Sequence, residues 1–235
     1  MARIALGTAF RDSTPYLLDY FAQVTALRDT ITARGDQLIP AWVWGDCCDA
    51  TSQWLETYLD NLGCEAYLLE HTHGGKDYGH TQHPLRFQEL AGVGNAVLSQ
   101  VPPDVNVLLY VESDLLWRDA DLLTLVDDLL QSDIALALPM VLRSDTSIFY
   151  DIWAYRIQER KFSPRWPYHP VLCESEPRFV ELSGGGSAIA MTGETARLTQ
   201  AIGFEAWDLW PGLLRALRVY GKRAWLDREV TIYHP

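Results

Sequence analysis

The sequence has no long hydrophobic run and no recognisable targeting segment. No apolar stretch approaches the roughly 18 residues that a helix needs to cross a bilayer. The apolar stretch at the N-terminus is too short for a secretory signal and has no small-residue cleavage site after it. We therefore expect no membrane span and a cytoplasmic location. The 235 residues contain no internal repeat or low-complexity segment and can bury a full core as one domain.

Cysteines and cations are also scarce. The four cysteines, Cys47, Cys48, Cys64 and Cys173, have no CxxC spacing. Reduced thiols are therefore expected rather than a disulfide framework. The chain has 19 Lys and Arg against 31 Asp and Glu, a net charge of −12. This balance disfavours broad electrostatic binding to nucleic acid or anionic lipid, but it does not exclude a local basic groove.

Two common nucleotide-binding signatures are absent. No GxGxxG follows the first apolar stretch, and no GxxxxGK[ST] occurs anywhere. A dinucleotide-dependent dehydrogenase and a P-loop enzyme are therefore disfavoured. The glycine run at residues 184–186 lies too late in the chain to act as a dinucleotide loop.

What the sequence does contain is an alternation of strand and helix patterns over the first 140 residues. Strands are predicted at 3–9, 38–44, 64–69, 105–111 and 134–138, and helices at 14–34, 52–62, 85–98 and 121–130. This alternation predicts a parallel, helix-covered sheet. The second half is less regular: a helix is expected at 149–161, a loop at 162–177, strands at 178–183 and 188–191, a helix at 213–220, and strands at 224–227 and 230–233.

The strand predicted at 105–111 ends in two acids. It is almost wholly apolar, as in a strand buried on both faces, and Glu112 and Asp114 follow it. Ligands bind at the carboxyl ends of strands in open α/β sheets, and acids one residue apart point to the same side of an extended chain. Carboxylates placed together repel unless a positive charge lies between them, and a divalent cation with phosphates is a common solution. The alternative is a polar strand end that caps the next helix.

Four stretches carry a family resemblance: residues 6–11, residues 43–51, residues 110–114, and residues 204–209 with the apolar helix and strand that lead to His234. Their order resembles that of nucleotide-sugar glycosyltransferases of the GT-A fold, especially family-2-like members. The resemblance implies an α/β, GT-A-like fold: a Rossmann-type, mostly parallel sheet flanked by helices, with a smaller mixed acceptor-side sheet. It also implies a single domain, in which residues 1–140 bind the nucleotide sugar and residues 141–235 bind the acceptor.

The resemblance assigns residues to the donor and to a metal ion. Asp114 would be the direct metal ligand, Glu112 would contact ribose or metal-bound water, and His234 would complete the coordination of Mn²⁺ or Mg²⁺. The nucleotide-sugar contacts would come from Thr8, Ala9, Arg11, Asp46, Arg86, Glu112, Ser113, Asp114, Gly185 and Gly186.

Several of these residues have plainer interpretations. Asp46 and Asp49 are common turn and cap residues, so one can cap a helix while the other, by our choice Asp46, faces the base. Arg11 and Arg86 could balance the diphosphate or be solvated at the surface. A surface position is the default for His234, and the glycines at 185 and 186 could form a bulge instead of a sugar contact.

The resemblance places a catalytic base in the loop that begins at residue 204. An inverting transfer needs a carboxylate that removes the proton of the acceptor hydroxyl. The family usually has adjacent acids here, whereas Glu205 and Asp208 are three residues apart, which leaves open which one serves as base. Asp208 is our first candidate and Glu205 the second. A helix N-cap is the alternative for Asp208.

A histidine-rich loop is left without an assignment. His71, His73, His80 and His83 lie within thirteen residues. A zinc site is one interpretation, and a polar loop near the donor or acceptor is the one we favour.

The leading hypothesis is a metal-dependent transferase that moves a hexose from a nucleoside-diphosphate sugar, most readily a UDP- or GDP-sugar, to a hydroxyl of a glycan or similar acceptor. One alternative is a glycosyltransferase that acts on hydroxymethylated bases of DNA. Others are a sugar-phosphate nucleotidyltransferase and an inactive sugar-nucleotide-binding protein.

Overall fold

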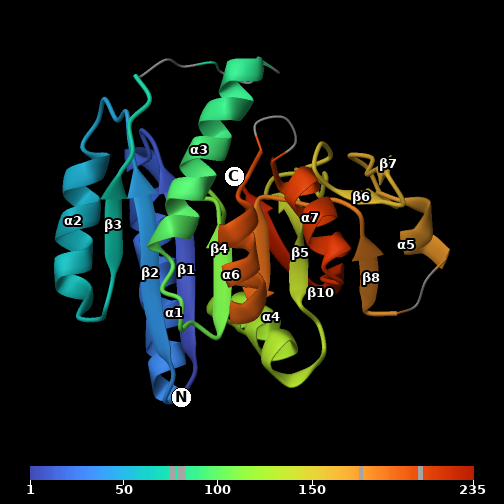
Figure 1. Ribbon diagram of the computed structural model, residues 1–235, viewed down its shortest axis with the longest axis horizontal. Helices are drawn as coiled ribbons and strands as arrows, with labels where there is room; N and C mark the ends of the chain where they lie inside the picture. The colour runs from blue at the N-terminus through green and yellow to red at the C-terminus, as the bar shows by residue number, and fades with distance from the viewer. Residues whose placement is uncertain (75–77, 79–82, 175–176, 206–208) are drawn as a thin grey trace.

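The computed structural model describes residues 1–74, 78, 83–174, 177–205 and 209–235. Its elements run along the chain as shown in Figure 1: β1 (Arg3–Phe10), α1 (Thr14–Ala33), β2 (Gln37–Trp44), α2 (Thr51–Leu62), β3 (Tyr67–Glu70), α3 (Pro84–Gln100), β4 (Val107–Val111), α4 (Asp119–Gln131), β5 (Leu136–Arg143), β6 (Arg156–Ile157), β7 (Arg160–Lys161), α5 (Pro170–Glu174), β8 (Phe179–Leu182), β9 (Ala188–Thr192), α6 (Gly193–Ile202), α7 (Leu209–Val219) and β10 (Ala224–His234).

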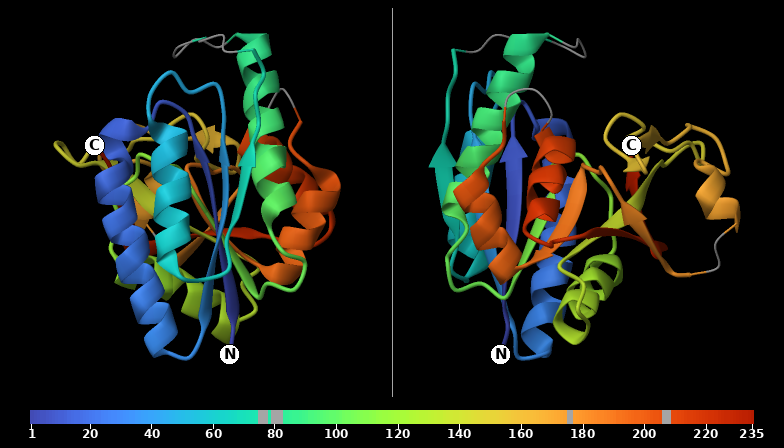
Figure 2. Two further views of the ribbon diagram at one scale, coloured as in Figure 1. Left: turned by 90° about the vertical axis from the view of Figure 1, so that its left-hand side faces the viewer. Right: turned by 45° about the vertical axis from the view of Figure 1, so that its right-hand side comes forward.

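One eight-stranded sheet organises the molecule. Its strand order is β3-β2-β1-β4-β9-β5-β10-β8. The first four of these strands are parallel, β9 runs antiparallel to both of its neighbours, and β10 is parallel to β5 and antiparallel to β8. Helices α1, α2 and α4 cover one face, and α3, α6 and α7 cover the other (Figure 2). The α/β fold class expected from the sequence is therefore confirmed.

The core follows from the apolar patterning. All five residues of β4 are buried, as expected of a central strand covered on both faces. Helix α1 turns Leu17, Val24, Leu27 and Ile31 inward at helical spacing. These contacts fix the positions at which β1, β2 and β4 end, and the candidate site lies at those ends.

The smaller sheet differs from the expectation. Strands β5, β8, β9 and β10 join the main sheet instead of forming a separate mixed one. The separate sheet is the two-stranded antiparallel hairpin β6–β7.

The helix predicted at residues 149–161 is wrong. This segment forms turns and the β6–β7 hairpin, with Gln158 and Glu159 at positive φ in the turn. Its aromatic residues Phe149 and Tyr155 pack against each other with ring centroids 4.9 Å apart, and both also contact Phe162. Burial of these rings in one cluster favours this irregular path over a helix.

Three smaller differences concern the second half. The segment expected to be a loop at 162–177 contains the short helix α5, and α6 was not predicted. The two strands expected at 224–227 and 230–233 are one strand, β10, with an irregularity between Asp227 and Thr231.

No helix in the described part of the chain is both long enough and apolar enough to cross a membrane. The four cysteines are free thiols, as expected from their spacing.

A buried carboxylate pair joins α4 to β10. Asp227 is fully buried, and the guanidinium of Arg178 donates to Asp227 Oδ2 and to Asp128 Oδ2, each at 2.6 Å. Burial, together with a hydrogen bond that protonated Asp128 donates to Asp227, raises the pKa of Asp128 to about 6, although Arg178 opposes this rise. In the folded state Asp128 therefore holds a proton that the unfolded chain releases near pH 4.

This pair predicts a pH-dependent stability. Because the folded-state pKa of Asp128 lies above its unfolded value, its contribution to stability falls as pH rises from about 4 to about 6. Asp128→Asn cannot ionise, so the variant should gain on the order of 1 kcal/mol relative to the parent between pH 4.5 and pH 7.5 in urea denaturation. Asp60→Asn, at an exposed position on α2, controls for net charge. An equal stability difference at both pH values would contradict the account.

Candidate active site

A cavity of about 400 Å³ opens at the carboxyl ends of β1, β2 and β4, with α3 as its far wall. Six of the predicted donor-binding residues line it: Ala9, Arg11, Arg86, Glu112, Ser113 and Asp114. They come from three separate stretches of the chain. The fold therefore brings together most of the residues that the sequence assigned to the nucleotide sugar.

The two acids after β4 face this cavity. Burial raises the pKa of Glu112 to about 8, and the nearby carboxylates of Asp114 and Asp151 add to the rise. The charge of Arg86 and a hydrogen bond from Ser187 act in the opposite direction. Glu112 therefore favours a proton in the absence of added positive charge, and a cation beside it would favour the carboxylate.

His234 meets Asp114 at the edge of the cavity. Its Nε2 atom lies 3.1 Å from Oδ2 of Asp114, although 120 residues separate the two in sequence. The imidazole stacks on the ring of Tyr150, with centroids 3.8 Å apart. Two backbone hydrogen bonds between Leu116 and Tyr233, of 2.7 and 2.8 Å, tie the end of β10 to the segment that follows Asp114. The backbone thus positions both side chains.

This arrangement fits a divalent cation. Carboxylate oxygen and neutral imidazole nitrogen are ligands that Mn²⁺ accepts, and carboxylates suit Mg²⁺. Asp114 and His234 would supply two ligands, with Glu112 beside them, which leaves coordination positions for phosphate oxygens and water.

A second layer of polar residues supports Glu112 from behind. The amide of Glu112 donates to the carbonyl of Ser187 at 3.0 Å, and the Ser187 hydroxyl donates to Oδ2 of Asp151 at 3.0 Å. Burial raises the pKa of Asp151. Neither role was predicted from the sequence, in which Asp151 lay within the incorrectly predicted helix.

Asp46 was expected to face the base, but its side chain contacts His73 and does not line the cavity. Asp46 Oδ2 accepts a hydrogen bond from the His73 amide at 2.9 Å and lies 2.6 Å from His73 Nδ1. The His73 amide is the main cause of the lowered pKa of Asp46. His73 and Glu89 line the cavity and Asp46 does not. His73 therefore stands between Asp46 and the cavity, an arrangement that sequence reasoning missed.

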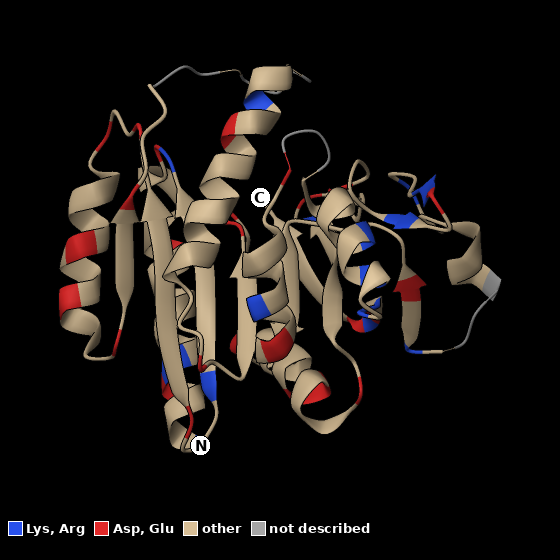
Figure 3. Cartoon of the chain, in the orientation of Figure 1, with Lys and Arg blue, Asp and Glu red and all other residues tan. Residues whose placement is uncertain are grey.

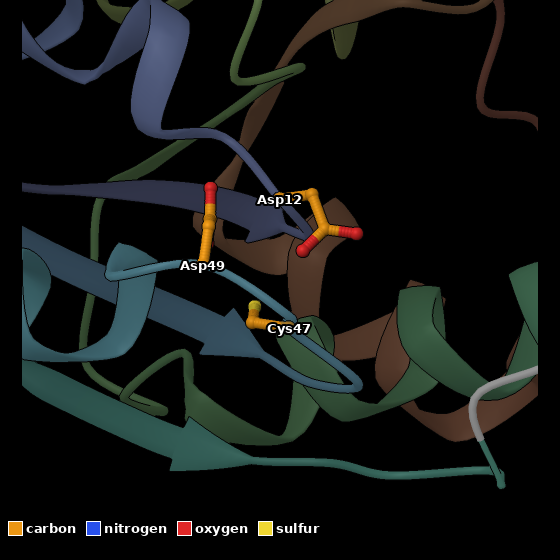
Figure 4. A group of neighbouring side chains, drawn as sticks. All are labelled: Asp12, Cys47 and Asp49. Carbon is orange, nitrogen blue, oxygen red and sulfur yellow. The ribbon is translucent and has the colours of Figure 1, made fainter.

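Asp49 acts as a cap. Its two oxygens accept from the amides of Thr51 and Thr14 at 2.9 and 3.1 Å. Burial would raise its pKa, but hydrogen bonds from both threonines lower it to about 2. Asp49, Asp12 and Cys47 gather closely enough to resemble a metal cluster (Figure 4). Because Asp12 also accepts from the Cys48 amide at 2.6 Å, backbone hydrogen bonds account for this group.

Three predicted donor contacts lie away from the cavity. Thr8 is fully buried, and its hydroxyl is 2.6 Å from the hydroxyl of Tyr20 in the core. A Cβ on Gly185 would come within 2.3 Å of Leu138, and one on Gly186 within 2.8 Å of Asp151. The two glycines therefore allow close packing of protein against protein.

The predicted catalytic loop is only partly described. Asp208 lies outside the described residues, and Glu205 is exposed and does not line the cavity. The two described flanks of the loop are anchored at Tyr110, a cavity residue: Phe204 lies 6.4 Å and Trp210 4.9 Å from its ring, measured between centroids. The loop thus starts and ends beside the cavity.

The described histidines of the histidine-rich loop have separate roles. His71 and His73 line the cavity, and the ring of His83 caps α3 by accepting from the Leu85 amide at 3.2 Å. His80 lies outside the described residues. The favoured interpretation, a polar loop near the donor, agrees with the positions of His71 and His73.

Comparison with solved structures identifies the architecture. The mannosyltransferase PcManGT from Pyrobaculum calidifontis, in complex with GDP-Man and Mn²⁺, matches 99% of this chain with a TM-score of 0.62 and 15% identity. S. aureus TarS 1–349 matches 100% of the chain with a TM-score of 0.60 and 11% identity, and its complex with UDP-GlcNAc matches 99% with a TM-score of 0.57 and 13% identity. These are GT-A-type structures.

The chain has the GT-A fold. It spans 56 to 60% of the length of these three structures. No protein-family model and no curated protein matches the sequence.

Gly45 is a structural requirement of the cavity wall in this GT-A fold. A Cβ at Gly45 would lie 1.7 Å from the carbonyl oxygen of His71, because the residue that follows β3 lies directly beside the end of β2. The His71 amide donates to the carbonyl of Trp44 at 2.8 Å, which holds the two backbones together. Only glycine allows it.

Gly45→Ala should therefore cost about 3 kcal/mol or more, since a backbone atom cannot move aside as a side chain can. Gly35→Ala is the matched control: Gly35 has φ +78° and open space around its Cβ position, so only backbone strain of about 1 kcal/mol is expected. Urea denaturation of both variants measures the difference. Equal losses of unfolding free energy in the two variants would show that the backbone at His71 moves aside easily.

Proposed function

We propose that this protein is a metal-dependent glycosyltransferase that moves a hexose from a nucleoside-diphosphate sugar to an acceptor hydroxyl. The observation that carries the proposal is the convergence of Asp114 and His234, 3.1 Å apart, beside Glu112 at the edge of a 400 Å³ cavity. The GT-A fold supports the same conclusion. The complexes of the similar structures with GDP-Man, UDP and UDP-GlcNAc make a GDP- or UDP-sugar the first donor to test.

Different cavity residues would contact different parts of the donor. Arg11 and Arg86 place positive charge where a diphosphate would lie. His73 and Glu89, on the side of β3 and α3, offer hydrogen-bonding groups to a base, and Asp46 holds His73 in position. A divalent cation held by Asp114 and His234, Mn²⁺ or Mg²⁺, would stabilise the negative charge that develops on the leaving diphosphate.

Asp208 is our candidate for the catalytic base, with Glu205 second. In an inverting transfer the base takes the proton of the acceptor hydroxyl as its oxygen bonds to the anomeric carbon and the bond from that carbon to the diphosphate breaks. The packing of Phe204 and Trp210 against Tyr110 supports this assignment, because both described flanks of the segment lie beside a cavity residue.

The two halves of the chain take different partners under this proposal. Residues 1–140 supply most of the cavity and would bind the donor, and residues 141–235 would bind the acceptor, together forming one domain. A nucleotidyltransferase would instead release pyrophosphate from a nucleoside triphosphate and a sugar phosphate. An inactive protein would bind donor without turnover.

The metal site predicts how nucleotide binding responds to substitution. In a thermal-shift assay, UDP or GDP should raise the melting temperature of the parent protein only with Mn²⁺ or Mg²⁺ present. Asp114→Asn and His234→Ala should weaken Mn²⁺-dependent binding at least tenfold, since even residues that merely support metal ligands have effects of that size.

Tyr233→Phe is the matched control, because Tyr233 neighbours His234 on β10 and is exposed. This variant should bind as the parent does. Nucleotide binding that is equally tight without any divalent cation, or that survives both substitutions, would contradict the metal assignment.

The base assignment predicts a separation of rate from binding. Asp208→Asn should lower kcat by about 10²- to 10⁴-fold, measured as release of nucleoside diphosphate from the donor, while the donor-dependent thermal shift stays unchanged. Glu205→Gln should leave kcat within a few-fold. If Glu205→Gln lowers kcat and Asp208→Asn does not, Glu205 is the base. Full activity of both variants would show that neither residue is the base.

A further inference from the structure

Cations gather on one part of this acidic protein. Residues 152–173 include four Arg or Lys and a single acid, Glu159, although the chain as a whole carries a net charge of −12. Figure 3 shows these cations on the β6–β7 hairpin and the turns beside it. Arg160, Lys161 and Arg165 are exposed.

These cations differ from four arginines elsewhere on the surface. Arg3, Arg34, Arg118 and Arg178 each form an ion pair with a carboxylate. Within the described ranges of the chain, Arg160, Lys161 and Arg165 form none, and the recorded partner of Lys161 is an aromatic ring. Although the protein has 31 acids, these three cations form no ion pair with any of the described ones.

Two exposed tryptophans flank the cations. Trp153 is 61% exposed and Trp166 is 64% exposed. Lys161 Nζ lies 4.2 Å from the centre of the Trp153 ring, and the Trp166 ring meets Tyr168 edge-on at 5.5 Å. Large apolar rings left in water together with unpaired cations are the combination that binds nucleic-acid strands, in which bases stack and phosphates carry the charge.

This surface follows the candidate active site closely along the chain. Tyr150 stacks on His234, and Asp151 is hydrogen-bonded to Ser187 behind Glu112. Trp153 follows Tyr150 by three residues, so their Cα atoms are at most about 11 Å apart. A polymer bound at the hairpin could therefore extend to the residues that would hold the metal and the donor.

We propose that Trp153, Arg160, Lys161, Arg165 and Trp166 form a docking surface for a nucleic-acid strand, which carries the acceptor hydroxyl to the active site. The inference rests on the proposed function, since it names the acceptor class of that site. A neutral glycan would stack on the tryptophans but would make no use of the cations. The acidic charge of the rest of the chain confines the contact to a few phosphates.

The test is binding of a fluorescently labelled single-stranded 12-mer DNA by anisotropy, from 20 to 200 mM KCl. Three phosphate contacts predict a slope of about −2 in the plot of log K against log salt concentration. Arg160→Gln with Arg165→Gln should weaken binding at 20 mM KCl at least tenfold and flatten this slope. Trp166→Ala should weaken it about tenfold with little effect on the slope. Trp153→Ala is the second stacking variant, should Trp166→Ala unfold.

Arg218→Gln with Arg223→Gln is the matched control. Both arginines are exposed and pair with Glu181, so the substitution removes the same charge elsewhere on the surface. The control should bind DNA nearly as the parent does. An equal loss in both double variants would show a net-charge effect and overturn the docking surface.

Competition with inorganic polyphosphate separates a nucleic-acid surface from a general anion surface. Polyphosphate has no bases to stack. Displacing the labelled DNA should therefore need at least a tenfold higher phosphate concentration of polyphosphate than of unlabelled DNA. Equal competition would assign the surface to a polyanion such as a sugar-phosphate polymer and overturn the nucleic-acid assignment.

The donor thermal shift keeps the two proposals distinguishable. Donor binding without DNA binding at 20 mM KCl would overturn this inference alone. DNA binding without donor binding would preserve the docking surface and remove the proposed transferase function.

Discussion

Mutual repulsion of carboxylates at the end of β4 is the constraint on which the site depends. Glu112, Asp114 and Asp151 approach one another in a partly buried setting, and burial with these neighbours raises the pKa of Glu112 to about 8. Such a group is stable only with a proton, with cations, or with donors from the backbone. The structure supplies Ser187 from behind and Arg86 from the front. The carboxylate charge that these groups leave unbalanced lies at the cavity. A cation bound there with a diphosphate would balance it.

The mixed sheet is what assembles this group from distant parts of the chain. Strand β9 enters antiparallel between β4 and β5, so the residue before it, Ser187, reaches the amide of Glu112. Strand β10 then runs parallel to β5 and bonds to Leu116, which brings His234 to Asp114. The parallel strand β4 thus leads to Glu112 and Asp114, and the mixed half of the sheet brings Ser187 and His234 to them.

The sequence predicted those parts of the structure that depend on local pattern. The apolar run of β4 and the spacing of Glu112 and Asp114 place two acids at a sheet edge, and family order alone singled out His234. The helix predicted at residues 149–161 was wrong because Phe149 and Tyr155 are buried in a tertiary cluster, which the local sequence does not reveal. The contact of Asp46 with His73 depends on how the chain turns after β3, and no periodicity encodes that. Thr8 lies on a strand buried on both faces, where sequence position does not tell cavity from core. Asp208 stays a prediction.

The most direct measurement is the anomalous scattering of Mn²⁺ in crystals grown with Mn²⁺ and UDP or GDP. The account predicts a manganese peak within about 2.3 Å of the Asp114 carboxylate and His234 Nε2, with diphosphate oxygens completing its coordination. A diphosphate bound in the cavity with no manganese beside it would contradict the central claim. So would a peak confined to Asp12, Cys47 and Asp49.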